Sequence, residues 1–293
     1  MRNSFGAASY AFAQRCGKVR LIFMYVCPKC KLPLSVEKNS YKCRNGHCYD
    51  ISSKGYVNLI LGSKSGGHGD NKEMLAARRQ FLSLDHYLPI VAQLADIIQL
   101  SIGAENIIRI LDAGCGEGYY TSALYEELKK RGISTTIYGV DVSKEGIAMA
   151  AKKYKSCFFS VASVNALPFS DGSFDVVLSL FAPIAEKEFY RVLKTAGSMI
   201  TVSPSPRHLL GLKKEIYDNV YENEETTFVP QFFAHAESSA WNGEMMLFNN
   251  LDINNLFKMT PYYYKTDEKG RLRVNALQSL TTEIGFMFYR YTK

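Results

Sequence analysis

Short apolar runs alternate along this chain with segments whose apolar residues recur every three to four positions. Residues 107–111 form a run rich in β-branched side chains, which predicts a buried strand. A tight glycine-containing turn and a helical pattern over residues 119–131 follow it. Further strands are predicted by similar runs at residues 135–141, 158–162, 176–180 and 198–202. Strands that alternate with helices predict an α/β fold with a doubly wound, mostly parallel sheet.

The flanking segments carry weaker patterns. Residues 244–248 and 284–291 alternate between apolar and polar side chains, as antiparallel strands do. Two helices are predicted before the strand at residues 107–111, at 71–84 and 90–100, where good helix formers cluster. A short helix is predicted near the C-terminus, at residues 254–259. The C-terminal strands are therefore expected to pair with each other at one side of the sheet.

The turn after residues 107–111 is suited to a cofactor. Asp112 ends the strand, and Gly114, Gly116 and Gly118 follow at alternate positions. Glycines let a backbone approach a ligand, which in such sheets binds beyond the carboxyl ends of the strands. The pattern D-x-G-C-G-x-G differs from G-x-G-x-x-G, and Glu117 would repel a pyrophosphate but tolerate a cation. S-adenosylmethionine (AdoMet), with a sulfonium, an ammonium and no phosphate, fits this turn.

A second carboxylate ends the next predicted strand. Asp141 is placed where it can accept hydrogen bonds from both ribose hydroxyls of a nucleoside. Capping the following helix is its alternative role, for which Ser143 is better placed. Residues 165–175, which include L-P-F-S-D-G-S-F-D, then lead into a buried strand. These segments resemble the class I AdoMet-dependent methyltransferases, which implies a Rossmann-like seven-stranded sheet with an antiparallel last strand.

Size and charge narrow the class of protein only slightly. The chain has 293 residues, which suits one large α/β domain and a small module. No apolar run approaches the ~20 residues needed to cross a membrane, so we expect a cytoplasmic protein without a membrane partner. The formal net charge of +7 permits a nucleic-acid partner and does not require one.

Four of the seven cysteines lie close together near the amino terminus. Cys27 and Cys30 form a C-x2-C knuckle, and Cys43 and His47 supply a second pair after a step long enough for a short hairpin. In a chain with a cofactor-binding core, this clustering indicates metal rather than disulfides. A Cys3His set fills all four positions of a Zn²⁺ ion, so the site would be structural. Cys48 is a rival to His47, although the C-x3-H spacing favours His47.

The chain divides into four segments on this interpretation. Residues 1–23 are basic and contain no acidic residue, which predicts a disordered extension or an over-extended start. Residues 24–61 form the zinc-binding module, and residues 62–106 form a Gly/Ser-rich linker with two helices. Residues 107–293 form the methyltransferase domain.

A series of short motifs gives the chain a more specific resemblance. They are C-P-K-C at 27–30, K-G-Y-V-N-L at 54–59, A-R-R at 77–79, H-Y-L-P at 86–89, F-A-P at 181–183, P-R-H-L at 206–209 and M-T-P at 259–261. In this order they resemble the RlmA family, the 23S rRNA (guanine-N1)-methyltransferases. The resemblance runs from about Cys27 to the C-terminus, and residues 1–23 have no counterpart in it.

The resemblance implies a substrate and further cofactor residues. The expected target is a guanosine in the hairpin loop of helix 35 of 23S rRNA, held by the zinc-binding module, and a homodimer is compatible with the family. Members differ in which neighbouring guanosine they modify, and some are linked to macrolide resistance, so the sequence leaves that choice open. Tyr87 and His208 would border AdoMet. The expected cofactor residues are Tyr87, Asp112, Gly114, Gly116, Glu117, Gly118, Asp141 and His208.

The expected reaction asks little of side chains, because the sulfonium already activates the methyl group. The enzyme must hold guanine N1 in line with that methyl group and accept the N1 proton, directly or through water. Phe181, Ala182 and Pro183 follow the fourth strand, where backbone carbonyls could meet the guanine edge and Phe181 could stack on an extruded base. Core packing is the alternative role of Phe181. The proton acceptor stays unassigned, because Asp175 is more typical of a strand start.

Two other functions remain open on sequence alone. A class I methyltransferase acting on a small molecule or a tRNA could carry the same core, with the zinc module as a stabiliser. A non-enzymatic zinc-ribbon RNA-binding protein would lack a use for the AdoMet motifs. Binding to helix 35 RNA, compared with tRNA and small metabolites, discriminates among the three.

Overall fold

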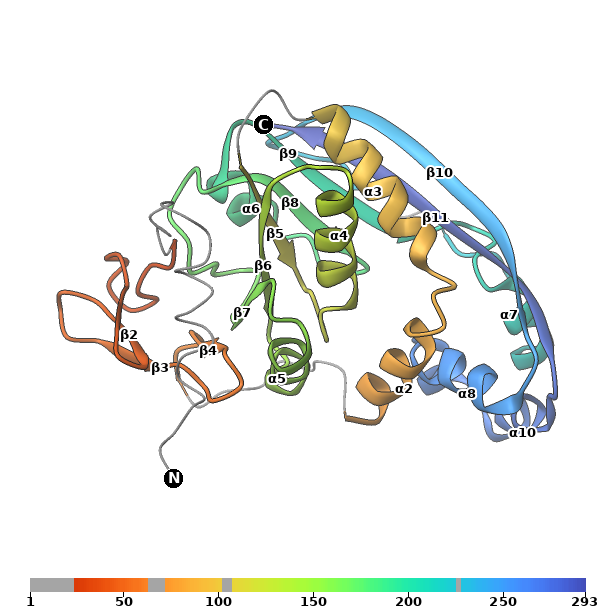
Figure 1. Cartoon of the computed structure of the whole chain (residues 1–293). Coiled ribbons are helices and arrows are strands. Elements are labelled where there is room, and N and C mark those ends of the chain that lie inside the picture. Colours follow the sequence, from red (N-terminus) through yellow and green to blue (C-terminus); the bar gives the residue numbers. More distant parts are fainter. Residues whose placement is uncertain (1–23, 63–71, 102–106, 225–227) are drawn as a thin grey trace.

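The structure is a computed structural model that describes residues 24–62, 72–101, 107–224 and 228–293. The expectations for residues 1–23 and for most of the Gly/Ser-rich linker lie outside the described residues. Figure 1 shows a central sheet with the zinc-binding module at one end and a group of helices at the other. No helix in the described ranges is long and apolar enough to span a bilayer.

The main sheet confirms the predicted doubly wound fold. Its order is β10-β11-β9-β8-β5-β6-β7-β4, and the pairs from β9 to β4 are parallel, whereas β11 pairs antiparallel with both β9 and β10. The five central strands are β5 (Ile108–Ala113), β6 (Thr135–Asp141), β7 (Phe158–Val161), β8 (Phe174–Leu180) and β9 (Leu193–Pro204). The antiparallel pair is β10 (Ala234–Leu247) and β11 (Leu280–Thr292).

Both faces of the sheet are buried, as in other parallel sheets. Ile108 and Ile110 of β5 belong to one apolar cluster, which includes residues of α3 (Leu88–Ser101), α4 (Tyr119–Lys130) and α5 (Lys144–Lys153). Leu111 and Ala113 belong to the other cluster, with α6 (Glu186–Val192) and the zinc-binding module. The continuous apolar run in the sequence therefore reflects burial on two sides.

The zinc-binding module is joined to the main sheet by its own backbone. It contains a three-stranded antiparallel sheet of β1 (Ser35–Glu37), β2 (Ser40–Lys42) and β3 (Cys48–Asp50). It then adds β4 (Val57–Asn58) to the edge of β7, which makes the main sheet eight-stranded rather than seven-stranded. The methyltransferase domain itself supplies the seven expected strands, β5 to β11, and β4 is an addition from the module. This added strand was not predicted, because two residues are too few to leave a periodic pattern.

Aromatic side chains pack the module against the face of the sheet that carries Leu111 and Ala113. Tyr25 stacks on Phe169 with 5.1 Å between ring centroids and meets the edge of Tyr138 at 6.0 Å. The backbone N–H of Val26 donates to the carbonyl of Pro168 at 2.9 Å. The residues just before the first cysteine are thus part of the core as well as of the module.

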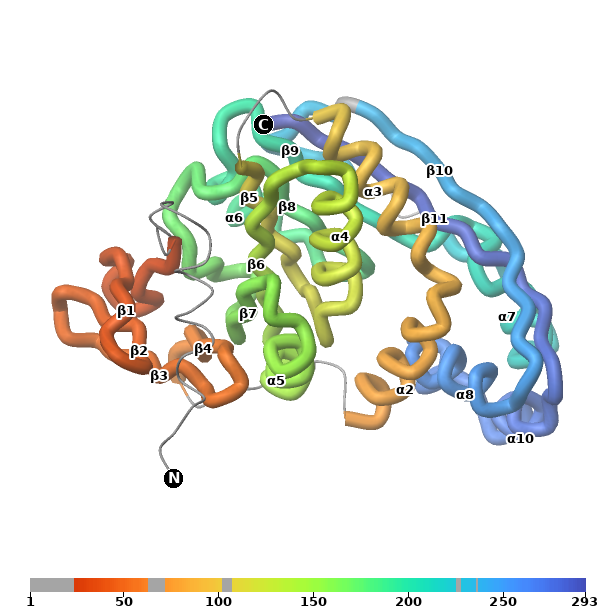
Figure 2. Tube along the Cα trace, in the orientation of Figure 1, coloured from red at the N-terminus to blue at the C-terminus, as the bar shows by residue number. Residues whose placement is uncertain are grey.

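The second end of the molecule is built on a long ribbon. β10 pairs with β11 along its whole length, whereas β9 pairs only with residues 286–292 of β11, so residues 280–285 of β11 extend beyond β9. This extension leads to a helical group with which α2 (Lys72–Leu82) packs (Figure 2). The group consists of α7 (Leu210–Ile216), α8 (Asn250–Lys258), α9 (Tyr262–Lys265) and α10 (Glu268–Ala276).

Candidate functional site

The glycine turn after β5 closes only because its first glycine lacks a side chain. Gly114 has φ of 93°, and a Cβ atom there would lie 2.5 Å from the Cβ atom of Ala182. The turn after β5 and the turn after β8 therefore touch each other at a point that tolerates no added carbon. This contact brings the predicted cofactor turn and the predicted target-base turn into one site.

A cavity of about 850 Å³ lies beyond the carboxyl ends of these strands. All the expected cofactor residues line it except Gly118, which stands behind the turn at the start of α4, and Phe181, Ala182 and Pro183 line it as well. Sequence reasoning missed several further lining residues, which come from helices and loops far away in the chain: Arg78, Asn165, Asn223, Tyr262 and Lys265.

Asp141 ties two loops of the site together. One of its carboxylate oxygens accepts a hydrogen bond from the backbone N–H of Gly116 at 2.9 Å, and the other accepts from that of Ser143 at 2.7 Å. The hydroxyl of Ser143 accepts from the N–H of Gly146, so Ser143 caps α5 as predicted. A carboxylate oxygen can accept more than one hydrogen bond, so Asp141 is also suited to a ribose hydroxyl.

Two buried carboxyl groups give the cavity an affinity for a cation. Asp112 and Glu117 are 1% and 2% exposed. The hydroxyl of Thr121 donates to one oxygen of Asp112, while the other oxygen and both oxygens of Glu117 have no hydrogen-bond partner within the described part of the chain. Burial raises the pKa of each group to about 7. Unpaired buried carboxylates are costly, so these groups fit the ammonium of AdoMet, which would supply the missing partner.

His208 is a neutral hydrogen-bonding residue of the cavity wall. The N–H of Gly285 donates to its Nδ1 at 3.3 Å, which leaves the proton on Nε2, 3.2 Å from the hydroxyl oxygen of Tyr87. Burial, assisted by the charge of Lys213, lowers the pKa of His208 to about 3. His208 therefore donates to Tyr87, and the hydroxyl hydrogen of Tyr87 stays available for another acceptor.

A buried lysine holds the wall beside His208. The ammonium of Lys213, which is fully buried, donates to the side-chain oxygen of Asn223 at 2.8 Å and to the carbonyl of Tyr221 at 3.0 Å. The side-chain amide of Asn223 donates in turn to the carbonyl of His208, and the hydroxyl of Tyr262 donates to Asn223. The sequence signal was a lysine within an apolar helical stretch, which only the fold places next to the cavity.

Phe181 has the geometry of a cavity residue rather than of a core residue. Its φ of 55° lies in the left-handed region, and the side chain is 45% exposed. Its ring approaches those of Tyr120 and Phe286 with centroid distances of 6.1 and 5.8 Å. A strained backbone that turns an aromatic ring partly outwards is common at binding sites.

The neighbouring polar groups are already engaged in the fold. The hydroxyl of Ser179 donates to the carbonyl of Ala182 at 3.0 Å, which holds the turn after β8 in shape. Asp175 does not line the cavity, because its carboxylate accepts from the backbone N–H of Arg109 and from the ammonium of Lys194. Asp175 is thus a structural residue at the start of β8.

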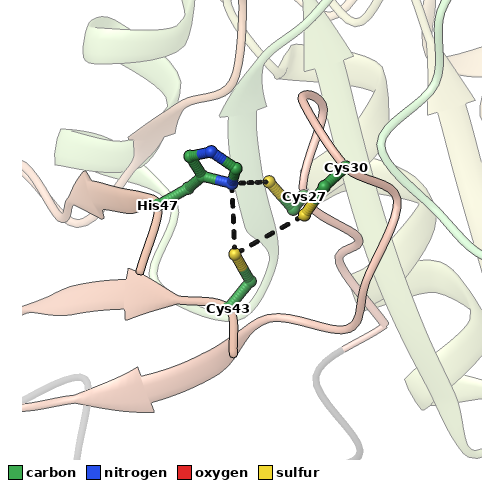
Figure 3. Close-up of side chains that lie close together, drawn as sticks. All are labelled: Cys27, Cys30, Cys43 and His47. Atoms are coloured by element: carbon green, nitrogen blue, oxygen red, sulfur yellow. Dashed lines mark hydrogen bonds between the residues drawn. The ribbon is translucent and has the colours of Figure 1, made fainter. Parts of the chain in front are cut away.

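The four predicted zinc ligands lie together in the amino-terminal module (Figure 3). Nδ1 of His47 is 3.5 Å from Sγ of Cys27 and 3.4 Å from Sγ of Cys43, and the sulfurs of Cys30 and Cys43 are 3.6 Å apart. A tetrahedral Zn²⁺ ion with ordinary bond lengths separates two sulfurs by about 3.8 Å and sulfur from nitrogen by about 3.6 Å. The donor set and its spacing therefore fit one zinc ion.

The surroundings of the cluster also suit a structural metal. Cys48 is exposed and is not among the four donors that converge. The hydroxyl of Tyr49 lies 3.2 Å from Sγ of Cys27, and a hydrogen bond of this kind orients a metal ligand from outside. The four donors leave no position for a water molecule, as expected of a zinc ion that stabilises a fold.

Known proteins resemble the two parts of this chain separately and together. Residues 25–61 match the family described as RlmA, N-terminal, and residues 105–260 match a methyltransferase domain family. YxjB of Bacillus subtilis, provisionally named a 23S rRNA (guanine-N1)-methyltransferase, is 34% identical over 250 residues, which cover 81% of this chain and 86% of that protein. The 23S rRNA (guanine(748)-N1)-methyltransferase of Streptomyces fradiae is 31% identical over 215 residues, covering 72% of this chain and 75% of that one.

Among solved structures, a provisionally named type II methyltransferase from Anaeromyxobacter dehalogenans is similar in outline. It covers 70% of this chain and 94% of its own length, with a TM-score of 0.48 and 14% sequence identity.

Proposed function

Because this chain belongs to the RlmA family of 23S rRNA (guanine-N1)-methyltransferases, we propose that its target is a guanosine in the helix 35 hairpin. The chain is an enzyme that transfers the methyl group of AdoMet to N1 of a guanosine in 23S rRNA. The observation that supports methyl transfer to a base is the cavity that joins the glycine turn to the turn at residues 181–183. A cofactor at one turn and a base at the other would face each other across it.

At the cofactor end, we assign roles by chemistry. AdoMet supplies a methyl group activated by its sulfonium. Asp112 and Glu117 receive its ammonium, because one oxygen of Asp112 and both oxygens of Glu117 otherwise lack hydrogen-bond partners in the described chain. Asp141 receives the ribose hydroxyls, and Gly114 and Gly116 allow the backbone to approach. Tyr87, oriented by His208, adds a hydroxyl donor to the same wall.

At the other end, the turn at residues 181–183 receives the base. The ring of Phe181 is exposed enough to stack on an extruded guanine, and stacking of this kind is how proteins hold bases that have left a hairpin loop. The N1 proton must leave during methylation. His208 is a poor acceptor for it, because Nδ1 already accepts from Gly285 and Nε2 carries a proton. A backbone carbonyl of the turn can accept a hydrogen bond from the guanine edge, and a water molecule takes the N1 proton.

The zinc-binding module supplies the grip on RNA. Cys27, Cys30, Cys43 and His47 hold one structural Zn²⁺ ion, which orders the module. The exposed basic side chains of the module include Lys29, Arg44 and Lys54. Those side chains contact phosphates, while the shape of the hairpin and its extruded bases supply the choice of site. A homodimer would place two such modules on one assembly.

Mapping of 23S rRNA methylation by mass spectrometry, in cells with and without the gene, tests the target. The expected result is one 1-methylguanosine within helix 35 that disappears when the gene is deleted and returns with a plasmid copy. Loss of a methyl group elsewhere in 23S rRNA would refute helix 35 as the target. Unchanged rRNA together with an altered tRNA or metabolite would favour the small-molecule or tRNA alternative.

A further inference from the structure

One face of α2 forms a roof over the cofactor cavity. Leu75, Arg78 and Leu82 line the cavity, and their spacing places them on one stripe of the helix. Leu75 and Leu82 are buried, so Arg78 is the polar member of an otherwise apolar stripe. A guanidinium in such a position can bind an anionic group that enters the cavity.

Arg78 lies directly over the glycine turn. Its Nη1 atom is 3.7 Å from the place that a Cβ atom on Gly116 would occupy. Its charge also acts on Glu117: burial raises the pKa of Glu117, while Arg79, Lys153 and Arg78 oppose that rise. The cavity therefore holds a guanidinium and, beside the same turn, a carboxyl group that has no hydrogen-bond partner among the described residues.

The roof lies at the end of the cavity where the amino-acid tail of AdoMet belongs. Asp141 and Ser163 line the cavity at the carboxyl ends of β6 and β7, which is the nucleoside end. α2 lies on the other side, next to α8 and away from β7 (Figure 1). A cofactor with its ribose at Asp141 would extend its tail below Arg78.

The tail is a zwitterion, and its two charges need opposite partners. Glu117 and Asp112 suit the ammonium, but they would repel the carboxylate. We propose that Arg78 receives the carboxylate of the methionine tail of AdoMet, through the paired N–H groups that a guanidinium offers to a carboxylate. The inference rests on the proposed function only for the identity of the cofactor.

α2 is held in place before the cofactor arrives. It packs on α8, and Nζ of Lys258 on α8 lies 2.8 Å from the carboxylate of Glu73 on α2. A side chain carried by a helix that is already anchored loses less freedom on binding than one on a loop. Through α8, the C-terminal helical group thus positions α2 and the contact that Arg78 offers to the cofactor.

Calorimetric titration of the full chain with AdoMet and with decarboxylated AdoMet tests the assignment. The unsubstituted protein should bind AdoMet more tightly than the decarboxylated analogue. Arg78→Met should weaken AdoMet binding roughly 10- to 100-fold and leave the affinity for the analogue nearly unchanged. Arg79→Met, on the same helix but outside the cavity lining, is the matched control and should preserve the ratio of the two affinities.

Equal weakening of both ligands in Arg78→Met would overturn the assignment, because Arg78 would then only support the roof. Unchanged affinities would overturn it as well. If Arg78→Met does not fold, Arg78→Lys keeps the positive charge but loses the paired N–H groups of the guanidinium. Its preference for AdoMet over the decarboxylated analogue should be smaller than that of the unsubstituted protein but should not disappear. An unsubstituted protein that binds neither ligand would refute the cofactor of the proposed function, and Arg78 with it.

Discussion

At the scale of single residues, Gly114 should be the least replaceable position of the site. Gly114→Ala adds a carbon that would stand 2.5 Å from Ala182 and imposes a left-handed backbone that costs about 1–2 kcal/mol without glycine. We expect weaker AdoMet binding by at least about tenfold, together with a lower melting temperature. Calorimetry and thermal unfolding measure the two effects.

Gly132→Ala separates the strain from the collision. Gly132 has φ of +75° and no atom within 4 Å of its added Cβ, so this variant carries the backbone strain alone. It should lose stability without losing AdoMet affinity. Equal AdoMet affinities for Gly114→Ala and the unsubstituted protein would contradict the placement of the cofactor at this turn.

The two buried carboxyl groups should make AdoMet binding depend on pH. Burial raises the pKa of Asp112 and of Glu117 to about 7, so both gain protons as the pH falls through 7. Only the ionised form attracts an ammonium, so AdoMet affinity should fall below pH 7, by about tenfold per pH unit for each carboxylate that is needed. Glu117→Gln should bind AdoMet more weakly at pH 8 and show a shallower pH dependence between pH 5.5 and 8. A pH-independent affinity in the unsubstituted protein would rule this out.

Protonation of the same carboxyl groups, which weakens AdoMet binding, should increase the stability of the protein without AdoMet. Because the folded state binds these protons more tightly than the unfolded state, their burial costs least at acid pH and most above pH 7. His208 has the opposite effect on stability. Because its pKa is lowered to about 3 in the folded state, the free energy of unfolding should decrease as the pH falls below about 6.5, the pKa of histidine in the unfolded state.

Cavity residues that belong to a recognisable sequence motif were predictable, whereas residues brought to the cavity only by the packing of distant segments were not. The expected set from Asp112 to Asp141 followed from strand ends and glycine spacing, and all but Gly118 line the cavity. Arg78 and Asn223 gave no such signal, since an arginine on a helix and an asparagine in a loop are ordinary surface residues. The packing of α2 and the ammonium of Lys213 place them at the cavity.

At the scale of elements, strands with a strong hydrophobic pattern were predicted, whereas elements formed through tertiary contacts were not. β5 to β8 were predicted within a few residues, because buried parallel strands are continuous apolar runs. β10 begins at Ala234 rather than at residue 244, and its first half is rich in alanine and serine. Those residues form a strand because β11 offers a long partner, which is a tertiary effect. α10 is a polar helix without a clear apolar stripe and was not predicted.

The zinc-binding module is an element whose order should depend on its metal. Cys27→Ser combined with Cys43→Ser removes two of the four donors, and the purified variant should contain no zinc and should melt at a lower temperature. Elemental analysis of protein purified without chelator measures the first effect. Cys48→Ser is the matched control, because Cys48 is exposed and outside the cluster, and it should keep one zinc ion per chain. Full zinc content in the double variant would disprove the ligand assignment.

At the scale of the whole molecule, RNA binding and cofactor binding should be separable. Lys29, Arg44 and Lys54 are exposed on the module, far along the sheet from the helical group (Figure 1). Replacing all three with glutamine should weaken RNA binding and flatten its salt dependence by roughly 0.7 to 0.9 per lost phosphate contact. AdoMet affinity should not change, because none of the three lines the cavity.

A single substitution on the same module provides the control. Lys42 forms an ion pair with Glu37 at 3.1 Å. In free energy, Lys42→Gln should therefore weaken RNA binding by less than one third of the effect of the triple variant. Helix 35 RNA that is methylated equally well by the triple variant at moderate salt would show that these charges are only a solvated surface.

The strand that joins the module to the sheet also governs solubility. β4 pairs with Ser160 and Val161 of β7, at a border of the sheet where these residues would otherwise present unpaired backbone groups. Exposed edges of this kind recruit strands from other molecules. Removal of zinc would loosen the module that carries β4 and uncover that edge. A zinc ion in the amino-terminal module would therefore also protect the methyltransferase domain against aggregation, and chelation should make the protein self-associate before its sheet unfolds.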